Sequence, residues 1–457
     1  MFARNPSLAR RLTKIILVVL SFVLLFFEFD TNALRTVGSE WFWSHQRETE
    51  SLIIARMVLS RQDGIFSRGG LAGLGSLDSS PPSWTFIPSR DQAKAYILGL
   101  RFDRYSPYKS QVGAQGLLFS ALDRLIPAPP RAKLRLFHGL NALLAALVLA
   151  LIILWFFEEF GLGPALFVFA TTVASQWLVV IARNLWWSLW AFFLPMLMVM
   201  LYMKRRPSPA ARRAWALGGL LALCFLVKFL LNGYEFLPAI LLMTVVPLAY
   251  YAVRERWAIG QILRYGLAAS LAAILAFAFS LSILLTQISS LREDGPKGMD
   301  YILWTMQKRT HGNPSDFPAV YTPSLKAGTL GVVLTYLKGP FFSSHDYRPA
   351  ESSAPAPSRF QIPYAALLIL FLAASVLILI NRKKAAARPH ARTGPALLAA
   401  VWFSLLAPLS WLVFFKAHSY IHTHLDFIVW HMPFTLFGFA LCGLAVRSLF
   451  SGRARAG

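Results

Sequence analysis

Charged residues are scarce in this chain, and acidic residues are scarcer than basic ones. Only 14% of its 457 residues are charged and 56% are hydrophobic, whereas an ordinary soluble domain is about 25% charged. This composition excludes a disordered chain and a cytosolic enzyme. Cysteine is equally rare, because Cys224 and Cys442 are its only examples and both lie within apolar runs. A disulfide scaffold and a cysteine-based metal site are therefore excluded as well.

Several motifs are also missing. The sequence has no Gly-x-x-x-x-Gly-Lys motif, so no phosphate-binding loop is available to drive transport with ATP. It has no obvious internal repeat, which disfavours a transporter built from inverted repeats. The basic segment 1–14 precedes an apolar run, but the bulky and acidic residues 26–30 follow in place of a small-residue cleavage site. This pattern predicts a retained signal anchor.

Long apolar runs, in contrast, are abundant. A helix that spans a membrane needs about 20 mostly apolar residues, and about ten segments approach that length. The predicted fold class is therefore an all-α polytopic membrane protein with about ten transmembrane helices. The expected helices cover residues 14–29, 138–157, 163–182, 186–203, 214–231, 236–253, 262–286, 362–380, 396–415 and 427–447.

The predicted helices form one membrane domain, 1–457, that is interrupted by two long polar loops. In chain order its parts are the first helix at 14–29, a loop at 30–137, helices two to seven at 138–286, a second loop at 287–361 and helices eight to ten at 362–447. We expect these outer loops to carry amphipathic helices that lie on the membrane surface.

Basic residues gather in the short connections between these helices. The chain has 45 Lys and Arg residues against 21 Asp and Glu residues, a formal charge of +24. If the N-terminus is cytoplasmic, the basic residues crowd loops 204–213 and 381–395, while the short outer turns have few. Because cytoplasmic loops are enriched in Lys and Arg, we predict a multi-pass protein of the cell (inner) membrane with both termini in the cytoplasm. No nucleic-acid partner is expected, since that would need a basic patch on a folded surface.

The first outer loop begins with carboxylates at the start of a helix. Leu52, Arg56 and Leu59 recur with a helical period, which suits an amphipathic helix on the membrane surface. Glu48 and Glu50 precede them, where carboxylates favour the positive end of the helix dipole. One interpretation is that these carboxylates only cap the helix. The other is that they carry out chemistry at the outer face.

The pattern Glu-Thr-x-x-x-x-Ile-x-Arg-x-x-Leu at 48–59 resembles the opening loop of the GT-C superfamily of glycosyltransferases, which includes aminoarabinose transferases and protein O-mannosyltransferases. In that superfamily an Asp-Glu pair begins a surface helix, and one carboxylate acts as the catalytic base or as a ligand for metal or acceptor. Glu48 matches the Glu, Thr49 the following Thr and Arg56 the helix Arg. Arg47 stands where the superfamily has Asp.

This resemblance implies a glycosyltransferase that takes a sugar from a polyprenyl-phosphate donor at the outer (periplasmic) face. Its acceptor would be a lipid, a glycan or a protein, and membrane lipids would surround it. Glu48 or Glu50, with Glu40 as a stand-in, would deprotonate the acceptor hydroxyl for a single inverting displacement. The charge that develops on the phosphate needs preorganised cations, and Arg56 belongs to the candidate phosphate-binding residues.

Polar residues also lie at other predicted outer turns. Arg183 and Asn184 lie between the third and fourth helices, and the planar fork of an arginine suits phosphate oxygens. Tyr234 and Glu235 lie between the fifth and sixth helices, where an ionisable side chain is a candidate for function. A local pair between Glu235 and Lys228 is the structural alternative. All these residues except Lys228 are taken as candidates for substrate binding.

The last predicted outer turn holds a histidine cluster with a lysine beside it, formed by Lys416, His418, His422 and His424. His418 and His422 share one face if the segment is helical. Because imidazole is a common metal ligand, a divalent cation at these two histidines is one explanation. Phosphate binding by Lys416 and the histidines is the second and is favoured for a lipid-phosphate substrate. Structural hydrogen bonding is the third.

The second outer loop adds one more candidate. Lys308 and Arg309 precede His311 and Gly312, a group that suits either a phosphate or an ordinary solvated loop, and Arg309 is the residue selected. The main alternative function is a transporter or flippase for a lipid-linked precursor, which would need the same phosphate-binding groups without a base. A membrane scaffold without enzymatic activity would have no reason to gather such residues at separate outer turns.

Overall fold

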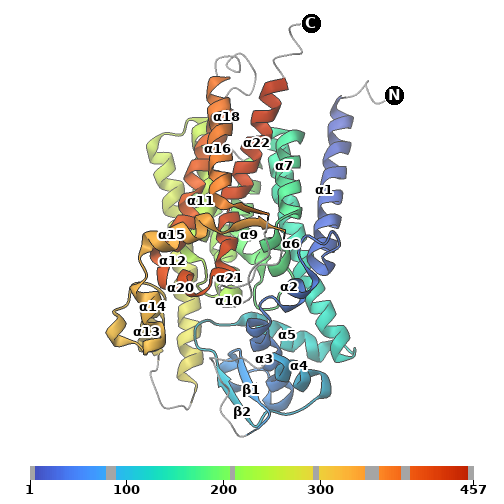
Figure 1. Ribbon diagram of the computed structural model, residues 1–457, viewed down its shortest axis with the longest axis vertical. Helices are drawn as coiled ribbons and strands as arrows, with labels where there is room; N and C mark the ends of the chain where they lie inside the picture. Colours follow the sequence, from blue (N-terminus) through green and yellow to red (C-terminus); the bar gives the residue numbers. More distant parts are fainter. Residues whose placement is uncertain are drawn as a thin grey trace.

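A computed structural model of the protein describes residues 6–78, 89–205, 211–291, 298–344, 360–381 and 392–450. The basic positions 206 and 382–388 lie outside these ranges. The described chain is mostly helical, and its long helices run side by side as a bundle (Figure 1). The strands described are two small antiparallel pairs, β1 (Gly73–Ser76) with β2 (Arg104–Pro107) and β3 (Pro340–Ser343) with β4 (Gln361–Pro363). The prediction of a helical chain is confirmed for the bundle.

Six helices in the described residues are long and apolar enough to cross a membrane. They are α1 (Pro6–Thr31), α6 (Pro130–Phe160), α10 (Ala211–Asn232), α11 (Leu237–Glu255), α12 (Ile259–Ser289), and the continuous pair α18 (Thr393–Ser404) and α19 (Leu406–Phe414). A seventh span results only if segment 423–431 and α22 (Phe434–Phe450), which meet at a bend of 45°, are counted together. Membrane character is supported, but the predicted count of about ten spans is not.

Helix breaks explain the smaller count. The apolar stretch that was expected to give two spans is divided among three shorter helices, α7 (Leu162–Val173), α8 (Gln176–Ile181) and α9 (Leu189–Arg205). Ser175 begins α8, because its hydroxyl accepts a hydrogen bond from the Leu178 amide (3.3 Å). α16 (Tyr364–Ile380) has only 17 residues. An apolar run shows that a segment avoids water, but it does not show where the helix within it ends.

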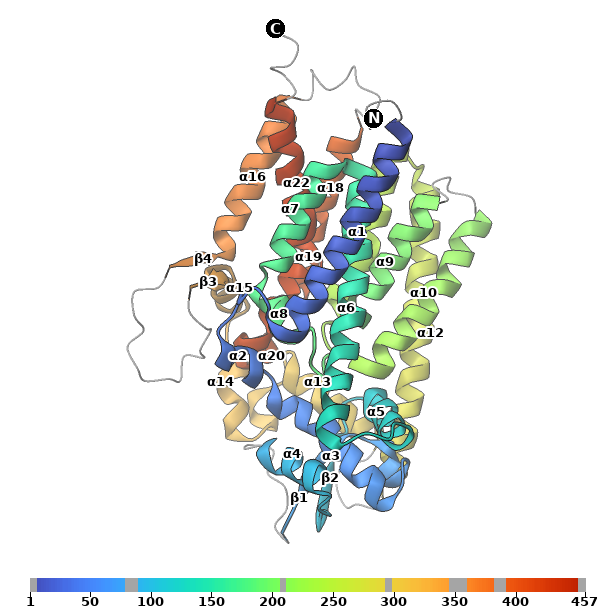
Figure 2. The ribbon, with the colours of Figure 1, turned by 90° about the vertical axis from the view of Figure 1, so that its right-hand side faces the viewer.

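The two ends of the bundle carry different parts of the chain. The start of α1 and the end of α22 lie together at one end, which we call the terminal end (Figures 1 and 2). The other end, here the loop end, carries α3 (Arg47–Asp63), α5 (Ala114–Leu125), α13 (Gly298–Arg309) and the β1–β2 pair. Parts of both long polar loops therefore lie at the same end of the bundle. Which end faces the cytoplasm stays a prediction.

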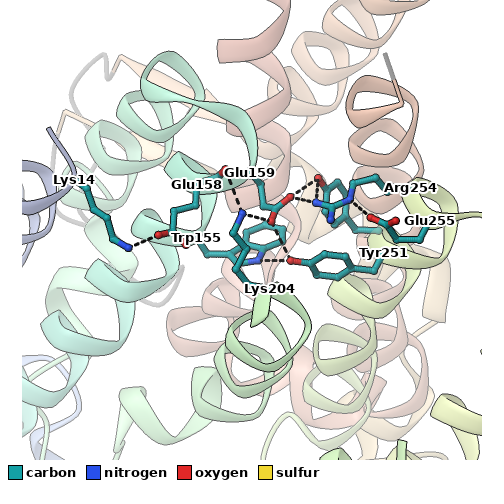
Figure 3. A network of polar contacts seen from close by, with 9 residues as sticks. Lys14, Trp155, Glu158, Glu159, Lys204, Tyr251, Arg254 and Glu255 are labelled. Carbon is teal, nitrogen blue, oxygen red and sulfur yellow. Dashed lines mark hydrogen bonds and ion pairs between the residues drawn. The ribbon is translucent and has the colours of Figure 1, made fainter. Parts of the chain in front are cut away.

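An ion cluster around the buried Glu159 links helices at the terminal end (Figure 3). Glu159 on α6, whose side chain is 2% exposed, forms ion pairs with Lys204 of α9 (2.8 Å) and with Arg254 of α11, and it accepts hydrogen bonds from two tyrosine hydroxyls of α11. The neighbouring Glu158 pairs with Lys14 of α1. A buried carboxylate is tolerated where charges and donors compensate it. The cluster therefore fixes the spacing of α1, α6, α9 and α11.

The first long loop folds into a small layer with α3 at its centre. α3 is buried on every side from Ser51 to Ser60, because α4 (Ser89–Leu98), α5 and β1 pack around it. The expectation that α3 is an amphipathic helix on the membrane surface is therefore wrong. Two of its buried polar side chains are bonded internally, because the Ser51 hydroxyl donates to the Arg47 carbonyl (2.7 Å) and the Arg56 guanidinium donates to main-chain carbonyls of the same loop. In the sequence such residues cannot be told from a side that faces solvent.

Candidate functional site

A cavity of about 800 Å³ is formed by side chains at the loop end of the bundle. Segments that are far apart in the sequence line it, namely the start of α3, the end of β2, the turns before α9 and α11, the end of α13, and α20 (Lys416–Ile421) with the residues after it. The predicted residues that line this cavity are Glu48, Glu235, Arg309, His418, His422 and His424. The fold therefore gathers candidates from four segments that are far apart in the sequence.

Glu48 is a carboxylate of this cavity that is left available. It lies in the first turn of α3, which Gln46 begins in a left-handed conformation with φ of 56°. The Gln46 carbonyl accepts hydrogen bonds from the Thr49 hydroxyl (3.0 Å) and the Asn184 amide (3.3 Å), which fix this turn. Glu48 is exposed, and no other described side chain forms a hydrogen bond or an ion pair with it. A ligand in the cavity can therefore reach its carboxylate.

Asn184 does not line this cavity, but it holds the turn that carries two of the lining residues. Its side-chain oxygen accepts hydrogen bonds from the amides of Trp186 (2.8 Å) and Trp187 (3.1 Å). The two indole rings line the cavity, whereas Asn184 lines a second, smaller cavity. Asn184 is thus placed to position the two tryptophans and not to contact a ligand beside Glu48.

A buried ion pair between Glu235 and Arg309 forms another part of the wall. Arg309 also donates a hydrogen bond to the Tyr108 hydroxyl (2.9 Å). Burial alone would raise the pKa of Glu235, but the Arg309 guanidinium beside it outweighs burial and lowers that pKa below its usual value. The Lys228 ammonium donates instead to the carbonyls of Gly233 (2.7 Å) and Glu235 (2.8 Å), so it does not form the expected pair with the carboxylate. Glu235 stays ionised and holds Arg309 in place.

His418 lies between two carboxylates. Its Nε2 is 3.7 Å from Oε2 of Glu235, and its Nδ1 is 3.5 Å from Oδ2 of Asp426. Asp426 is fully buried and also accepts a hydrogen bond from the Trp411 indole (2.7 Å). Asp426 was not among the residues predicted from the sequence, although an acidic residue two positions after His424 in a basic turn was a usable signal.

The remaining histidines stack beside His418. The ring centroids of His418 and His422 are 4.4 Å apart, and those of His422 and His424 are 5.5 Å apart. Burial, and then the neighbouring His418, lowers the pKa of His422 well below its ordinary value, so its imidazole is neutral. No three His, Cys, Asp or Glu side chains among the described residues are arranged to hold a metal ion. A divalent cation at His418 and His422 would therefore lack a third ligand of these types.

Two lysines that were not selected from the sequence also line the cavity. Burial, together with the charge of Arg309, lowers the pKa of Lys308 to about 8. The Lys308 ammonium lies 4.5 Å from the ring centroid of Trp304 and 4.7 Å from that of Tyr321. Lys109 is the second lysine. A lysine in a polar loop has no sequence pattern that distinguishes it from a solvated one.

Arg56, Tyr234 and Lys416 do not line this cavity. The buried guanidinium of Arg56 donates to main-chain carbonyls of the loop at 64–67. The Tyr234 ring packs against Phe277, with centroids 5.0 Å apart. The Lys416 ammonium donates to two main-chain carbonyls at the end of α14 (Thr322–Lys326), each at 2.8 Å. Their placement does not support the predicted roles in substrate binding. Arg56 and Lys416 instead hold segments of the two long loops, and Tyr234 packs against α12.

Glu50 and Arg183 face the second cavity, which Asn184 also lines. One carboxylate oxygen of Glu50 contacts Nε2 of His138 (2.7 Å) and accepts a hydrogen bond from the Leu185 amide (3.1 Å). The predicted pair of catalytic candidates is therefore divided, because Glu48 and Glu50 point from the same helical turn into different cavities.

Comparisons of the chain with protein-family models, with curated proteins and with solved structures found no match. No relative therefore supplies an activity, and the function is inferred from the chemistry of the cavity itself.

Proposed function

We propose that this chain is a membrane glycosyltransferase of the GT-C type, which moves a sugar from a polyprenyl-phosphate donor to a lipid, glycan or protein acceptor. The observation that carries this proposal is one cavity in which an available carboxylate, Glu48, faces cations and imidazoles. Such a set suits a reaction that removes a proton from one reactant and releases phosphate from the other. The cavity lies at the end of long apolar helices, where a donor can present its phosphate while its chain stays in the bilayer.

In this mechanism the Glu48 carboxylate takes the proton of the acceptor hydroxyl. The hydroxyl oxygen forms a bond to the anomeric carbon of the donor while the bond from that carbon to the phosphate oxygen breaks. The phosphate leaves with the bonding electron pair, and the single displacement inverts the anomeric carbon. Glu50 is a poorer base because His138 and the Leu185 amide occupy its carboxylate, and Glu235 is a poorer base because Arg309 does.

The leaving phosphate gains charge and needs donors that are already in place. Glu235 and Tyr108 orient the Arg309 guanidinium before any ligand binds. Lys308 adds a second cation beside it, and His422 adds a neutral imidazole. Arg309 and Lys308 thus take the place that the sequence analysis gave to Arg183 and Lys416.

Mass spectrometry of the lipids that co-purify with the protein tests this function. We expect a polyprenyl phosphate to be bound, and we expect the purified protein to transfer sugar from a polyprenyl-phosphate sugar to an acceptor in detergent. A preparation that retains no polyprenyl phosphate and transfers no sugar from such donors would contradict the proposal.

Lys308 is expected to make the binding of polyprenyl phosphate, the product that leaves in this mechanism, dependent on pH. A lysine whose pKa is lowered to about 8 is charged below that pH and loses its charge as the pH rises through it. Phosphate binds the charged form, and a phosphate monoester is itself already ionised above a pKa of about 6. Affinity for polyprenyl phosphate should therefore fall several-fold between about pH 7 and about pH 9. Tryptophan-fluorescence titration at each pH measures it.

The matched variant for this experiment is Lys308→Arg. A guanidinium stays charged throughout the same range, so the variant should bind polyprenyl phosphate with an affinity that changes little from pH 7 to pH 9. A wild-type affinity that is equally flat would show that Lys308 does not contact the phosphate.

A further inference from the structure

The second cavity has a volume of about 290 Å³ and shares no lining residue with the first among the described residues. Its walls come from the junction of α2 (Ser39–Ser44) and α3, from the first turns of α6, and from the turn at 180–184. The first turn of α3 separates the two cavities, because Glu48 and Thr49 line one and Arg47 and Glu50 line the other.

Basic side chains dominate this second cavity. Arg131, Arg135 and His138 recur at helical spacing along one side of α6, and Arg47 and Arg183 face them from other segments. Arg47, Arg131 and Arg135 have no carboxylate partner within the described ranges. The cavity therefore concentrates positive charge that the described protein does not neutralise.

Among the described residues, the carboxylate that lines this cavity is that of Glu50, and it already has partners. Glu50 is held by His138 and by the Leu185 amide. Burial alone would raise the pKa of Glu50, but His138 outweighs it and the pKa is lowered, so the carboxylate stays ionised. The Glu50 carboxylate is thus engaged by His138 and the Leu185 amide, and the guanidinium groups of Arg47, Arg131 and Arg135 are left for an anion from outside the chain.

Two further groups are arranged as fixed donors at this cavity. The Arg183 guanidinium stacks 4.4 Å from the ring centroid of Trp43 and donates to the Asp30 carbonyl (2.8 Å). Nδ1 of His45 accepts a hydrogen bond from the Trp41 indole (3.1 Å). Because burial lowers the pKa of His45 to about 3, its ring is neutral and carries its one proton on Nε2. That buried Nε2 has no partner in the described part of the chain, so it is a donor that needs an acceptor.

The position of the cavity along α6 indicates where the anion comes from. The basic residues occupy the first turns of α6, and its apolar run follows directly. On that run Leu136, Leu143 and Leu147 are exposed, with 52%, 37% and 43% of their surface accessible. Apolar side chains that no described part of the chain covers on a spanning helix face lipid. The arginines therefore lie at the depth where lipid headgroups meet the hydrocarbon core.

We propose that this second cavity binds the phosphate group of an anionic membrane lipid, at a site separate from the cavity of sugar transfer. The guanidinium forks of Arg47, Arg131 and Arg135 supply paired donors that match phosphate oxygens. The lipid would contact the first turn of α3 on the side opposite Glu48. Arg47, which stands where the GT-C superfamily has Asp, belongs to this lipid site and not to the transfer site.

Native mass spectrometry of the detergent-purified full chain tests the proposal, with dioleoyl phosphatidic acid and dioleoyl phosphatidylcholine as the probes. The variant Arg131→Gln/Arg135→Gln removes two exposed cations of the cavity. The matched control, Arg10→Gln/Arg11→Gln, removes two exposed arginines near the start of α1, at the terminal end. Both variants leave the first cavity intact, so the difference between them isolates the second cavity. The readout does not use sugar transfer and is independent of the proposed enzyme activity.

We expect the wild-type protein to bind phosphatidic acid more tightly than phosphatidylcholine. Arg131→Gln/Arg135→Gln should weaken phosphatidic acid binding by at least about tenfold, because two charge-assisted contacts are lost, and the control should change it by less than about twofold. If millimolar inorganic phosphate displaces phosphatidic acid, the site recognises the phosphate group alone. If it does not, the acyl chains add to the affinity. Both results are consistent with a lipid-phosphate site. Equal affinity for the two lipids, or equal weakening in the two double variants, would overturn it.

Discussion

Replacing Glu48 by Gln is expected to reduce the rate of sugar transfer by at least about 100-fold, which is the usual contribution of a general base. The amide keeps the size of the side chain but cannot take the proton of the acceptor hydroxyl. The folded state should be unaffected, because Glu48 is exposed and contacts no other described side chain through a hydrogen bond or an ion pair. Transfer from a polyprenyl-phosphate sugar at saturating donor, with size-exclusion chromatography alongside, measures both effects.

The matched control is Asp103→Asn, which removes one negative charge from an exposed position of the same loop, outside the first cavity. Its activity should equal that of the wild type. A Glu48→Gln protein that transfers sugar at the wild-type rate would show that Glu48 is not the base. If the protein is a transporter or flippase, the Glu48→Gln variant should still move a lipid-linked precursor across the membrane of vesicles. In that case neither the wild-type protein nor the Glu48→Gln variant should release polyprenyl phosphate.

Replacing Arg309 by Gln is expected to destabilise the protein by about 3 kcal/mol, the typical cost of leaving one partner of a buried ion pair without the other. The Glu235 side chain is only 8% exposed, and it would lose the Arg309 charge that lowers its pKa. Sugar transfer should also fall, since Arg309 is the cation that we propose to contact the phosphate. The midpoint of thermal unfolding in detergent and the transfer rate are the two measurements.

The double variant Glu235→Gln/Arg309→Gln separates the two effects. Two neutral amides leave no buried charge without a partner, so most of the stability should return while transfer stays low. Arg104→Gln, at an exposed arginine of β2, is the control and should match the wild type in both measurements. A single Arg309→Gln variant with unchanged unfolding would mean that the Glu235–Arg309 pair adds little to the folded state.

The arrangement of the site shows which parts of the prediction depended on local chemistry. The ends of apolar runs mark outer turns, so Glu235 and the histidines at 418, 422 and 424 were recognisable in the sequence as polar residues at the ends of predicted helices. Arg56 and Lys416 looked equally suitable, but their cationic groups donate to main-chain carbonyls. The sequence shows which side chains can donate a hydrogen bond. Only the fold decides whether the acceptor is a main-chain carbonyl or a ligand.

The sequence by itself determined that the chain is mostly helical and that its long helices are apolar enough to enter a membrane, because both properties follow from composition and run length. The tertiary structure decided the rest. It divided the stretch 163–203 into short helices, buried α3 within the first loop, and turned Glu48 and Glu50 into separate cavities. Neighbouring residues on a helix point in different directions, so their partners come from distant segments that only packing brings together.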